Sequence, residues 1–258
     1  EYVLKIDTDR RNAIRRNHSA AHLLQAALRK VLGNHVEQAG QLVTANSVRF
    51  DFTHFSALTA QELAKVEAIV NAAILDGRNV DVREMPIDEA KKLGAMALFG
   101  EKYGKTVRMV KMGDFSTELC GGTHVDNTAK IGLFRIISET SVAAGVRRIE
   151  AVTGANVLAL LGKYKDAIDE TATVLKSNNA LEIATRATAV TAELREANKK
   201  IEALEAKLAG SKINDLMANA IDKNGIKIVA ALLQNTAAPE LRTMCDKVKG
   251  DNPAAVCI

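Results

Sequence analysis

The stretch His18-Ser19-Ala20-Ala21-His22-Leu23-Leu24 decides how the first part of this chain is expected to fold. Its residue types favour a helix, and side chains four positions apart on a helix lie on the same face. His18 and His22 can therefore present two imidazole nitrogens to one metal ion. The same spacing also occurs on ordinary helices, so a metal site requires further ligands from elsewhere in the chain.

A second stretch, Glu118-Leu119-Cys120-Gly121-Gly122-Thr123-His124, offers those ligands. Cys120 and His124 are again four residues apart, and the two glycines between them favour a tight turn. Three of the five histidines of the chain fall in these two stretches. Three imidazoles and one thiolate form a complete tetrahedral set for Zn²⁺. The sequence therefore predicts a zinc site made of His18, His22, Cys120 and His124.

The helix that carries the histidine pair is predicted to run from about Asp9 to Leu32. Asp7, Thr8 or Asp9 can cap its start, and Gly33 favours a left-handed end. One face follows the three-and-four spacing of a buried stripe: Ile14, His18, Ala21, Gln25 and Leu28. The histidine pair is thus expected to face the body of the domain.

Four arginines precede the pair, namely Arg10, Arg11, Arg15 and Arg16. One interpretation is an ordinary solvated helix face. The other is a contact with RNA phosphates near the metal, because the guanidinium fork matches phosphate oxygens.

Composition limits the classes of function. The chain has 258 residues, of which 47% are hydrophobic and 26% charged, with a net charge of +4. This mild positive charge permits nucleic-acid binding without indicating it. Six Phe, three Tyr and no Trp make base stacking an unfavourable main binding mode. No apolar run is long enough to span a membrane, and three cysteines favour a reducing compartment, so we expect a cytoplasmic protein.

Several segments after the first helix have strand patterns: residues 42–53, 79–84, 105–112, 133–138 and 146–152. Two shorter helices are expected between them. One opens at the capping-box pattern of Thr59 and Glu62 and ends at Gly77, and the other covers residues 88–93. Strands with few, separate helices predict an α+β fold, with an antiparallel sheet packed around the long metal-binding helix.

A helical arm is expected after Gly154. Apolar residues alternate at spacings of four and three over more than three heptads: Ile183, Ala187, Val190, Leu194, Ala197, Ile201, Leu204 and Leu208. An earlier helix and a turn at residues 176–179 suggest a helical hairpin. This seam fits an intramolecular coiled coil and a homodimer equally well, because a heptad pattern does not name its partner.

Gly210 and Ser211 are expected to end the arm, and residues 213–221 to form another helix. A strand at 226–233 and a helix opening at Pro239 then begin a small α/β unit. The expected domains are residues 1–154, 155–210 and a truncated 211–258. Because the chain starts with Glu1 and stops as a further strand begins, we expect a fragment of a longer protein.

Six motifs resemble the editing domain of alanyl-tRNA synthetases. They are HSAAHLL (18–24), HVEQAG (35–40), VRFDF (48–52), GAMALFGEKY (94–103), GDFSTELCGGTH (113–124) and AGVRRIEAVTG (144–154). The resemblance covers about residues 8–154. The later helical and α/β segments are similar, more weakly, to the C-terminal domain of that family, which binds tRNA and supports dimerisation.

The resemblance implies a hydrolase that removes serine or glycine wrongly attached to tRNA(Ala). A pocket that accepts alanine cannot exclude glycine sterically, and it rejects an added hydroxyl poorly. It also implies that His18, His22, Cys120 and His124 hold zinc, that Gln38 lines the pocket, and that ATP-dependent aminoacylation lies outside this segment.

One position departs from the family. Ala21 stands where the family usually has a Thr that is thought to recognise the serine hydroxyl, and a methyl group cannot form a hydrogen bond. A related domain in threonyl-tRNA synthetase is therefore an alternative, but the motifs at 113–124 and 144–154 favour the alanyl type.

Ester hydrolysis needs an activated water and stabilisation of an oxyanion. Zinc can activate water, yet four protein ligands complete a tetrahedral shell, which is typical of a structural site. Either Cys120 swings away from the metal, or the metal only organises the pocket, which is the preferred hypothesis. In that case Gln38 and backbone amides at Gly121 and Gly122 would position water and substrate, beside the side chain of Ala21.

Two other functions fit the sequence. One is a freestanding alanyl-tRNA editing protein. The other is a non-catalytic, zinc-stabilised module for tRNA binding and dimerisation, which the methyl group of Ala21 would suit. Deacylation activity separates the catalytic hypotheses from the non-catalytic one.

Overall fold

The computed structural model describes residues 2–96, 104–233, 238–251 and 256–257. The chain divides into two compact units, Glu1–Asp166 and Ala167–Ile258. The motif at 94–103 falls largely outside the described residues, which end at Met96 and resume at Gly104. A mixed α/β fold with antiparallel sheets and a long helix confirms the general class that the sequence predicts.

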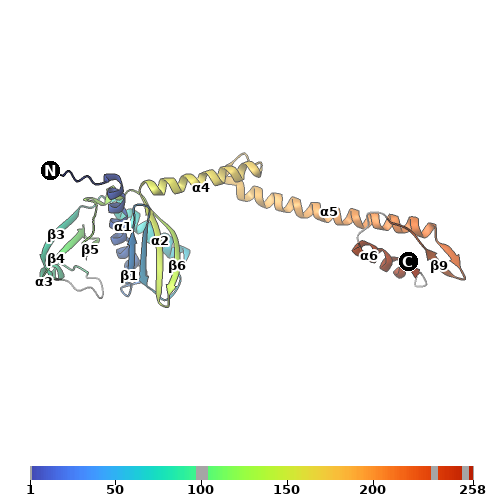
Figure 1. Cartoon of the computed structure of the whole chain (residues 1–258), viewed down its shortest axis with the longest axis horizontal. Coiled ribbons are helices and arrows are strands. Elements are labelled where there is room, and N and C mark those ends of the chain that lie inside the picture. Colours follow the sequence, from blue (N-terminus) through green and yellow to red (C-terminus); the bar gives the residue numbers. More distant parts are fainter. Residues whose placement is uncertain (1, 97–103, 234–237, 252–255, 258) are drawn as a thin grey trace. The chain divides into compact units, whose positions relative to one another are not determined.

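The first unit is built on α1 (Thr8–Leu32), which Figure 1 shows in dark blue between two sheets. The Asp7 side chain caps its start by accepting a hydrogen bond from the Arg10 backbone N–H. Gly33 ends it with φ +114°, a backbone conformation that L side chains rarely adopt. Ten neighbouring residues, Ser19 to Leu28, are all buried, so both sheets and α2 can pack against this helix.

Two antiparallel sheets surround α1, whereas the sequence predicted one. The first has the order β1-β2-β7-β6 and the second β3-β4-β5. Their strands are β1 (Gln38–Val43), β2 (Val48–Thr53), β7 (Val146–Thr153), β6 (Phe134–Ala143), β3 (Val80–Pro86), β4 (Thr106–Met112) and β5 (Ser116–Leu119). Cross-strand pairs such as Phe50 with Ile149 and Met109 with Leu119 fix the registers.

The strand β5 has no counterpart among the predicted strands. Its buried positions include Ser116 and Glu118, so it lacks the alternation of apolar and polar residues that marks a half-buried strand. The strand therefore carries polar groups into the interior beside α1, which matters for the site described below.

Three shorter helices of the first unit also pack into its buried clusters. They are α2 (Ala60–Leu75), α3 (Ile87–Lys92) and the short η1 (Thr128–Ile131). The predicted capping box is present, because Thr59 and Glu62 each bond the other's backbone N–H. Asn71 on α2 bonds the backbone of Phe134 in both directions and so joins this helix to β6.

Helix α4 (Ala155–Val174) contains the boundary between the two units and leads to a turn at Lys176, which has φ +53°. The short helix η2 (Ala180–Glu182) precedes α5 (Ile183–Ala218). The predicted break at Gly210 and Ser211 is wrong, because α5 continues through both residues. A single glycine inside a helix costs only about 1 kcal/mol relative to alanine. The predicted separate helix at 213–221 is likewise wrong, since it is the end of α5 followed by a strand.

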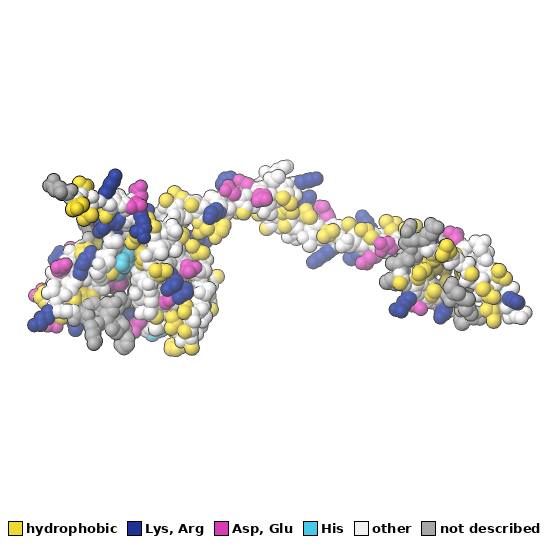
Figure 2. Space-filling model, in the orientation of Figure 1, with side chains coloured by type: hydrophobic (Ala, Val, Ile, Leu, Met, Phe, Trp, Pro, Cys, Tyr) yellow, Lys and Arg dark blue, Asp and Glu magenta, His cyan; other side chains and the backbone are white. Residues whose placement is uncertain are grey.

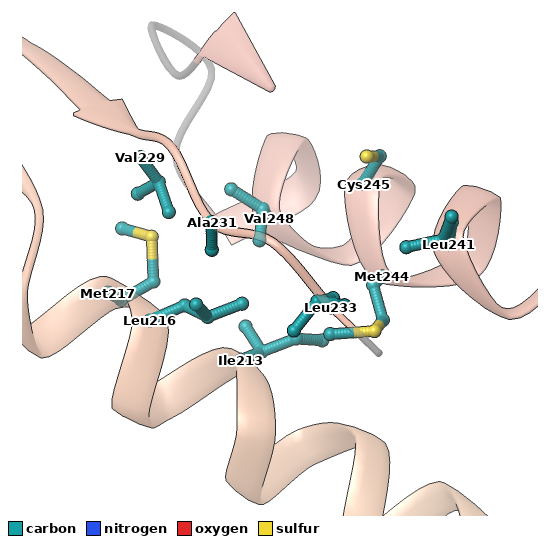
Figure 3. Close-up of a pocket in the computed structure, with 10 residues that line it drawn as sticks. All are labelled: Ile213, Leu216, Met217, Val229, Ala231, Leu233, Leu241, Met244, Cys245 and Val248. Carbon is teal, nitrogen blue, oxygen red and sulfur yellow. The ribbon is translucent and has the colours of Figure 1, made fainter. Parts of the chain in front are cut away.

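The last segment forms a small sheet and helix: β8 (Ile221–Lys223), β9 (Ile226–Val229), α6 (Ala238–Asp251) and β10 (Val256–Cys257). The strand β9 pairs antiparallel with β8 and parallel with β10. Figure 3 shows apolar side chains from α5 and α6 converging here, around a cavity of about 90 Å³. The buried centre consists of Ile213, Met244 and Val248, a far smaller core than that of the first unit.

The heptad seam of α5 is uncovered within the described residues. Leu194, Ile201, Leu204 and Leu208 are each more than half exposed. The Arg186 side chain, near the start of α5, donates a hydrogen bond to the backbone oxygen of Leu175 at the preceding turn. Coiled-coil pairing of the seam, with itself or with a second copy, thus stays a prediction. No helix of the described residues is long and apolar enough to cross a membrane.

Candidate metal centre

Four residues predicted as metal ligands lie together in the first unit. His18 and His22 come from α1, and Cys120 and His124 from the loop after β5. One ligand atom from each lies within 4.8 Å of all the others. Figure 2 shows histidine reaching the surface of this unit below a group of Lys and Arg side chains. The helical spacing of α1 and the loop that bends at Gly122 together produce this cluster.

Three distances between ligand atoms in the cluster are close to the edges of a tetrahedral zinc site. His22 Nε2 and His124 Nε2 are 3.0 Å apart. Cys120 Sγ lies 3.5 Å from His18 Nε2 and 3.6 Å from His124 Nε2. Bond lengths of about 2.0–2.1 Å to nitrogen and about 2.3 Å to sulfur give tetrahedral edges of about 3.3 and 3.6 Å. The donor set and its spacing therefore suit Zn²⁺.

A buried carboxylate fixes the orientation of His22. Its Nδ1 donates to Glu118 Oε2 at 2.6 Å, and Ser116 Oγ donates to Glu118 Oε1 at 2.8 Å. Both partners of Glu118 are themselves buried. With Nδ1–H held by Glu118, Nε2 is the nitrogen directed into the cluster, and a metal ion would displace its proton to bind there, which is the arrangement usual for a metal-binding histidine. Sequence reasoning gave Glu118 no role, because its only signal is its place in the motif at 113–124.

The loop between Cys120 and His124 is held by Arg108 on β4. One guanidinium nitrogen donates to the backbone oxygens of Cys120 and Gly122, each at 2.7 Å. The Gly122 N–H donates to Cys120 Sγ at 3.4 Å. A Cβ atom at Gly122 would lie 1.9 Å from His18 Cε1, so only glycine fits. The sequence predicted that Gly122 favours a turn, whereas the structure requires a glycine there because the backbone of Gly122 passes close to the His18 side chain.

The histidines also control the charge of the cysteine. Burial alone would raise the pKa of the Cys120 thiol, but hydrogen bonds with His124, His18 and His22 lower it well below its usual range. Burial would lower the pKa of His22, yet the neighbouring carboxylate of Glu118 and the sulfur of Cys120 raise it. This lowered pKa favours the thiolate form of Cys120, which is the form that binds metals.

Other predicted site residues lie at different distances from this centre. Ala21 is buried on α1 directly before His22. Gln38 is half-buried at the first position of β1, opposite Phe52, and has no hydrogen bond to the four cluster residues in the described part of the chain. Its role in the pocket stays a prediction.

The four arginines divide into two pairs. Arg10 and Arg11 are exposed near the start of α1, whereas Arg15 and Arg16 are half-buried closer to the cluster. Arg15 Nε donates to Thr123 Oγ1 at 3.1 Å and so contacts the ligand-bearing loop.

Two buried polar atoms near the cluster have no hydrogen-bond partner among the described residues. They are Nδ1 of His124 and Oε1 of Gln25. Gln25 follows Ala21 by four residues, so the two are neighbours on α1. The sequence placed Gln25 on the buried stripe, but nothing in the pattern indicated an unsatisfied oxygen.

Comparison with known proteins finds similar sequences. Residues 107–150, which include most of β4, all of β5 and the ligand-bearing loop, match a family described as the threonyl and alanyl tRNA synthetase second additional domain. The chain is 50% identical over 247 residues to alanine–tRNA ligase 1 of Lachnoclostridium phytofermentans, covering 96% of the chain and 28% of that relative. Over 258 residues it is 47% identical to alanine–tRNA ligase of Acetivibrio thermocellus, covering 100% of the chain and 29% of that relative.

A further relative, alanine–tRNA ligase of Bacillus anthracis, is 45% identical over 253 residues, which is 98% of the chain and 29% of the relative. The chain thus spans less than a third of the length of the relatives that it matches. Its residues 107–150 are similar to the second additional domain of threonyl and alanyl tRNA synthetases. More particularly, it is homologous to the region of alanine–tRNA ligases that carries this domain.

Proposed function

We propose that this chain is the editing region of an alanine–tRNA ligase and hydrolyses the ester bond of seryl- and glycyl-tRNA(Ala). The observation that carries the proposal is the cluster of three imidazoles and one thiolate, two of whose members, Cys120 and His124, lie in the segment that matches the domain of threonyl and alanyl tRNA synthetases. Aminoacylation with ATP belongs, in this proposal, to the remainder of the parent enzyme.

His18, His22, Cys120 and His124 would hold Zn²⁺, with Glu118 orienting His22. When bound, the ion supplies a fixed positive charge that attracts an oxygen of the substrate. Four protein ligands complete a tetrahedral shell, which favours a positioning role for the centre. The catalytic contribution of Cys120 is then to keep His18 and His124 in place through its sulfur.

Hydrolysis requires donors near the ester carbonyl, where negative charge develops. The Gly122 N–H is already engaged by Cys120 Sγ, whereas the exposed Gly121 has no backbone hydrogen bond in the described part of the chain. We assign stabilisation of the oxyanion to the Gly121 N–H, with Gly122 providing the space for His18. Gln38 would hold the attacking water through its amide.

The departure at Ala21 calls for another group to recognise serine. Oε1 of Gln25 is a buried acceptor without a partner, one helical turn beyond Ala21. A substrate hydroxyl would satisfy this oxygen, and leaving a buried acceptor unpaired is costly. We therefore assign serine recognition to Gln25, and glycine would be accepted because it is smaller.

The proposed partner is tRNA(Ala), with Arg10, Arg11, Arg15 and Arg16 contacting its phosphates. A homodimer through the C-terminal region is proposed from the exposed apolar seam of α5. A reducing compartment such as the cytoplasm is proposed because oxidation of Cys120 to a disulfide would remove the thiolate.

A non-catalytic tRNA-binding module is the second candidate, favoured by the methyl group at Ala21 and by the complete ligand shell. The test is hydrolysis of seryl-, glycyl- and alanyl-tRNA(Ala) by the chain beside Gln25→Leu and Ala21→Thr. The expected result is clearance of the seryl and glycyl esters, and a loss in Gln25→Leu that is confined to the seryl ester. Binding of tRNA with no clearance of either ester would replace the hydrolase with the non-catalytic module.

A further inference from the structure

A cavity of about 490 Å³ lies beside the cluster, between α1, β3 and the segment that follows His124. Its polar lining holds three cations, one carboxylate, one amide and one imidazole. These are Arg15, Arg16, Lys130, Asp126, Asn12 and His124. His124 thus belongs both to the cluster and to the lining of this cavity.

The two ring nitrogens of His124 have different surroundings. Nε2 lies close to His22 Nε2 and Cys120 Sγ, so it faces the cluster. Nδ1 is buried and has no partner in the described part of the chain. By contrast, Nδ1 of His22 is satisfied by Glu118. When Nε2 provides the lone pair, Nδ1 carries a proton that needs an acceptor, and among the described residues Glu118 supplies one to His22 whereas none is supplied to His124.

The cavity carries a surplus of positive charge. Lys130 Nζ donates a hydrogen bond to Asp126 Oδ2 at 2.7 Å, so these two opposite charges are paired. The carboxylate and one cation therefore neutralise each other. Arg15 is bonded through Nε to the neutral hydroxyl of Thr123. Neither Arg15 nor Arg16 has an ion-pair partner among the described residues, so two guanidinium charges are available to an anion.

These arginines are placed for a common ligand. Asn12, Arg15 and Arg16 are three and four residues apart on α1 and lie on one face of it. A Cβ atom at Gly154 would lie 3.0 Å from Arg16 Nε, so this glycine leaves the room that the Arg16 side chain occupies. Guanidinium groups bind phosphate through two parallel hydrogen bonds.

We propose that this cavity binds a phosphodiester group at the 3′ end of an RNA, through Arg15, Arg16 and the Nδ1–H of His124. The site rests on the proposed function, because the ester to be hydrolysed would sit on the cluster side of His124. The last phosphate and the terminal ribose belong to one nucleotide and are therefore close together. In this proposal they lie on opposite sides of the His124 ring, with the phosphate in the cavity and the ribose ester at the cluster. His124 would then bind the RNA phosphate through Nδ1–H while its Nε2 remains part of the cluster.

The test compares two acceptor-stem RNAs that end in CCA and carry no amino acid. One has natural phosphates, and the other has a neutral methylphosphonate in place of the last phosphodiester. The chain is expected to bind the natural RNA about tenfold or more tightly than the neutral one. Arg15→Gln combined with Arg16→Gln should bind both equally. Arg135→Gln, which removes a charge paired with Glu67 and outside the cavity lining, should keep the full preference.

Equal binding of both RNAs by the unchanged chain would overturn the site, as would a preference that survives the double substitution. A second readout uses the unchanged chain with ¹⁵N-labelled histidine, so it does not depend on the folding of a variant. The Nδ1–H signal of His124 should shift with natural RNA and not with the neutral RNA. No shift with either RNA would also overturn the site.

Two further comparisons separate the sources of phosphate and the two levels of the proposal. Inorganic phosphate should displace the natural RNA only weakly, and equal competition would identify a site for free phosphate instead. None of these RNAs carries an amino acid, so the binding comparison does not depend on hydrolysis. A chain that shows the binding preference but does not deacylate seryl-tRNA(Ala) would retain this site and lose the proposed hydrolysis. A chain that deacylates seryl-tRNA(Ala) but binds both RNAs equally would retain the hydrolysis and lose this site.

Discussion

The two long helices of this chain, α1 and α5, have similar sequence patterns and opposite environments. Of the 25 residues of α1, 11 are buried, whereas the 36 residues of α5 include one buried residue, Ile213. Both carry apolar residues at helical spacing. Sheets from distant parts of the chain cover α1, while the seam of α5 is exposed within the described residues. Periodicity therefore indicates a helix, but what covers the helix is encoded elsewhere.

This comparison also explains where chemistry can be placed. The covered helix α1 holds His22 in a fixed orientation against Glu118, because both side chains are buried and bonded. An exposed helix surface cannot exclude water in this way, and its charged groups interact weakly. The first unit can thus hold a catalytic centre, whereas α5 offers a surface for association.

The largest expected effect is on the core around α1. Leu24→Ala removes a fully buried side chain and should lower the free energy of unfolding of the first unit by about 3–5 kcal/mol. Denaturant unfolding followed by circular dichroism measures the change. A loss below about 1 kcal/mol would show that α1 is not packed as described.

A second prediction concerns the partner of His22. Glu118→Gln keeps the shape of the side chain but weakens its hold on the Nδ1–H of His22. Zinc affinity should fall about 10- to 100-fold, as is usual for partners of metal ligands. Competition with a chromophoric chelator measures it. Ser138→Ala, on β6 outside the cluster, serves as the control, and equal affinities in all three proteins would contradict the assigned role of Glu118.

The third prediction is a pH dependence in the first sheet. Hydrogen bonds from Arg148 hold the pKa of the Asp51 carboxyl below its usual range. A lowered folded-state pKa contributes stability above the unfolded value of about 3.9, and this contribution is lost as the pH falls further. The thermal midpoint should therefore fall by a few degrees more between about pH 6 and pH 3 in the unchanged chain than in Asp51→Asn. Parallel pH profiles of the two proteins would show that this carboxylate is not involved.

The smallest change in the free energy of unfolding is expected for a substitution in the exposed seam of α5. This substitution is the control for Leu24→Ala. Leu204→Ala should change the free energy of unfolding of the monomer by less than about 0.5 kcal/mol, because this side chain is 58% exposed. Sedimentation at increasing concentration would at the same time reveal any dimer that buries the seam. A stability loss comparable to that of Leu24→Ala would mean that α5 is covered in solution.

The sequence predicted those features that depend on local chemistry. Asp7 caps α1, Thr59 and Glu62 form their capping box, and each ligand pair, His18 with His22 and Cys120 with His124, lies together across its four-residue spacing. In each case a side chain meets backbone or another side chain at a spacing set by the helix or the turn itself.

Features that depend on long-range contacts were not predictable in this way. Glu118 and His22 are 96 positions apart, so no spacing rule connects them. The strand β5 was not predicted because it turns Ser116 and Glu118 inward. The division into two sheets was not predicted either. Gly210 suggested a helix end, but its small cost did not outweigh the continuous hydrogen bonding of α5.

The most direct test of the account measures zinc content and deacylation in the same sample. The chain should contain about one zinc per molecule, as expected for four ligands of one tetrahedral site, and should clear seryl-tRNA(Ala). Chelation, or His22→Ala, should abolish both properties, and returning zinc should restore clearance in the chelated sample only. Clearance that persists undiminished in metal-free protein would contradict the assignment of function to the His18, His22, Cys120 and His124 cluster.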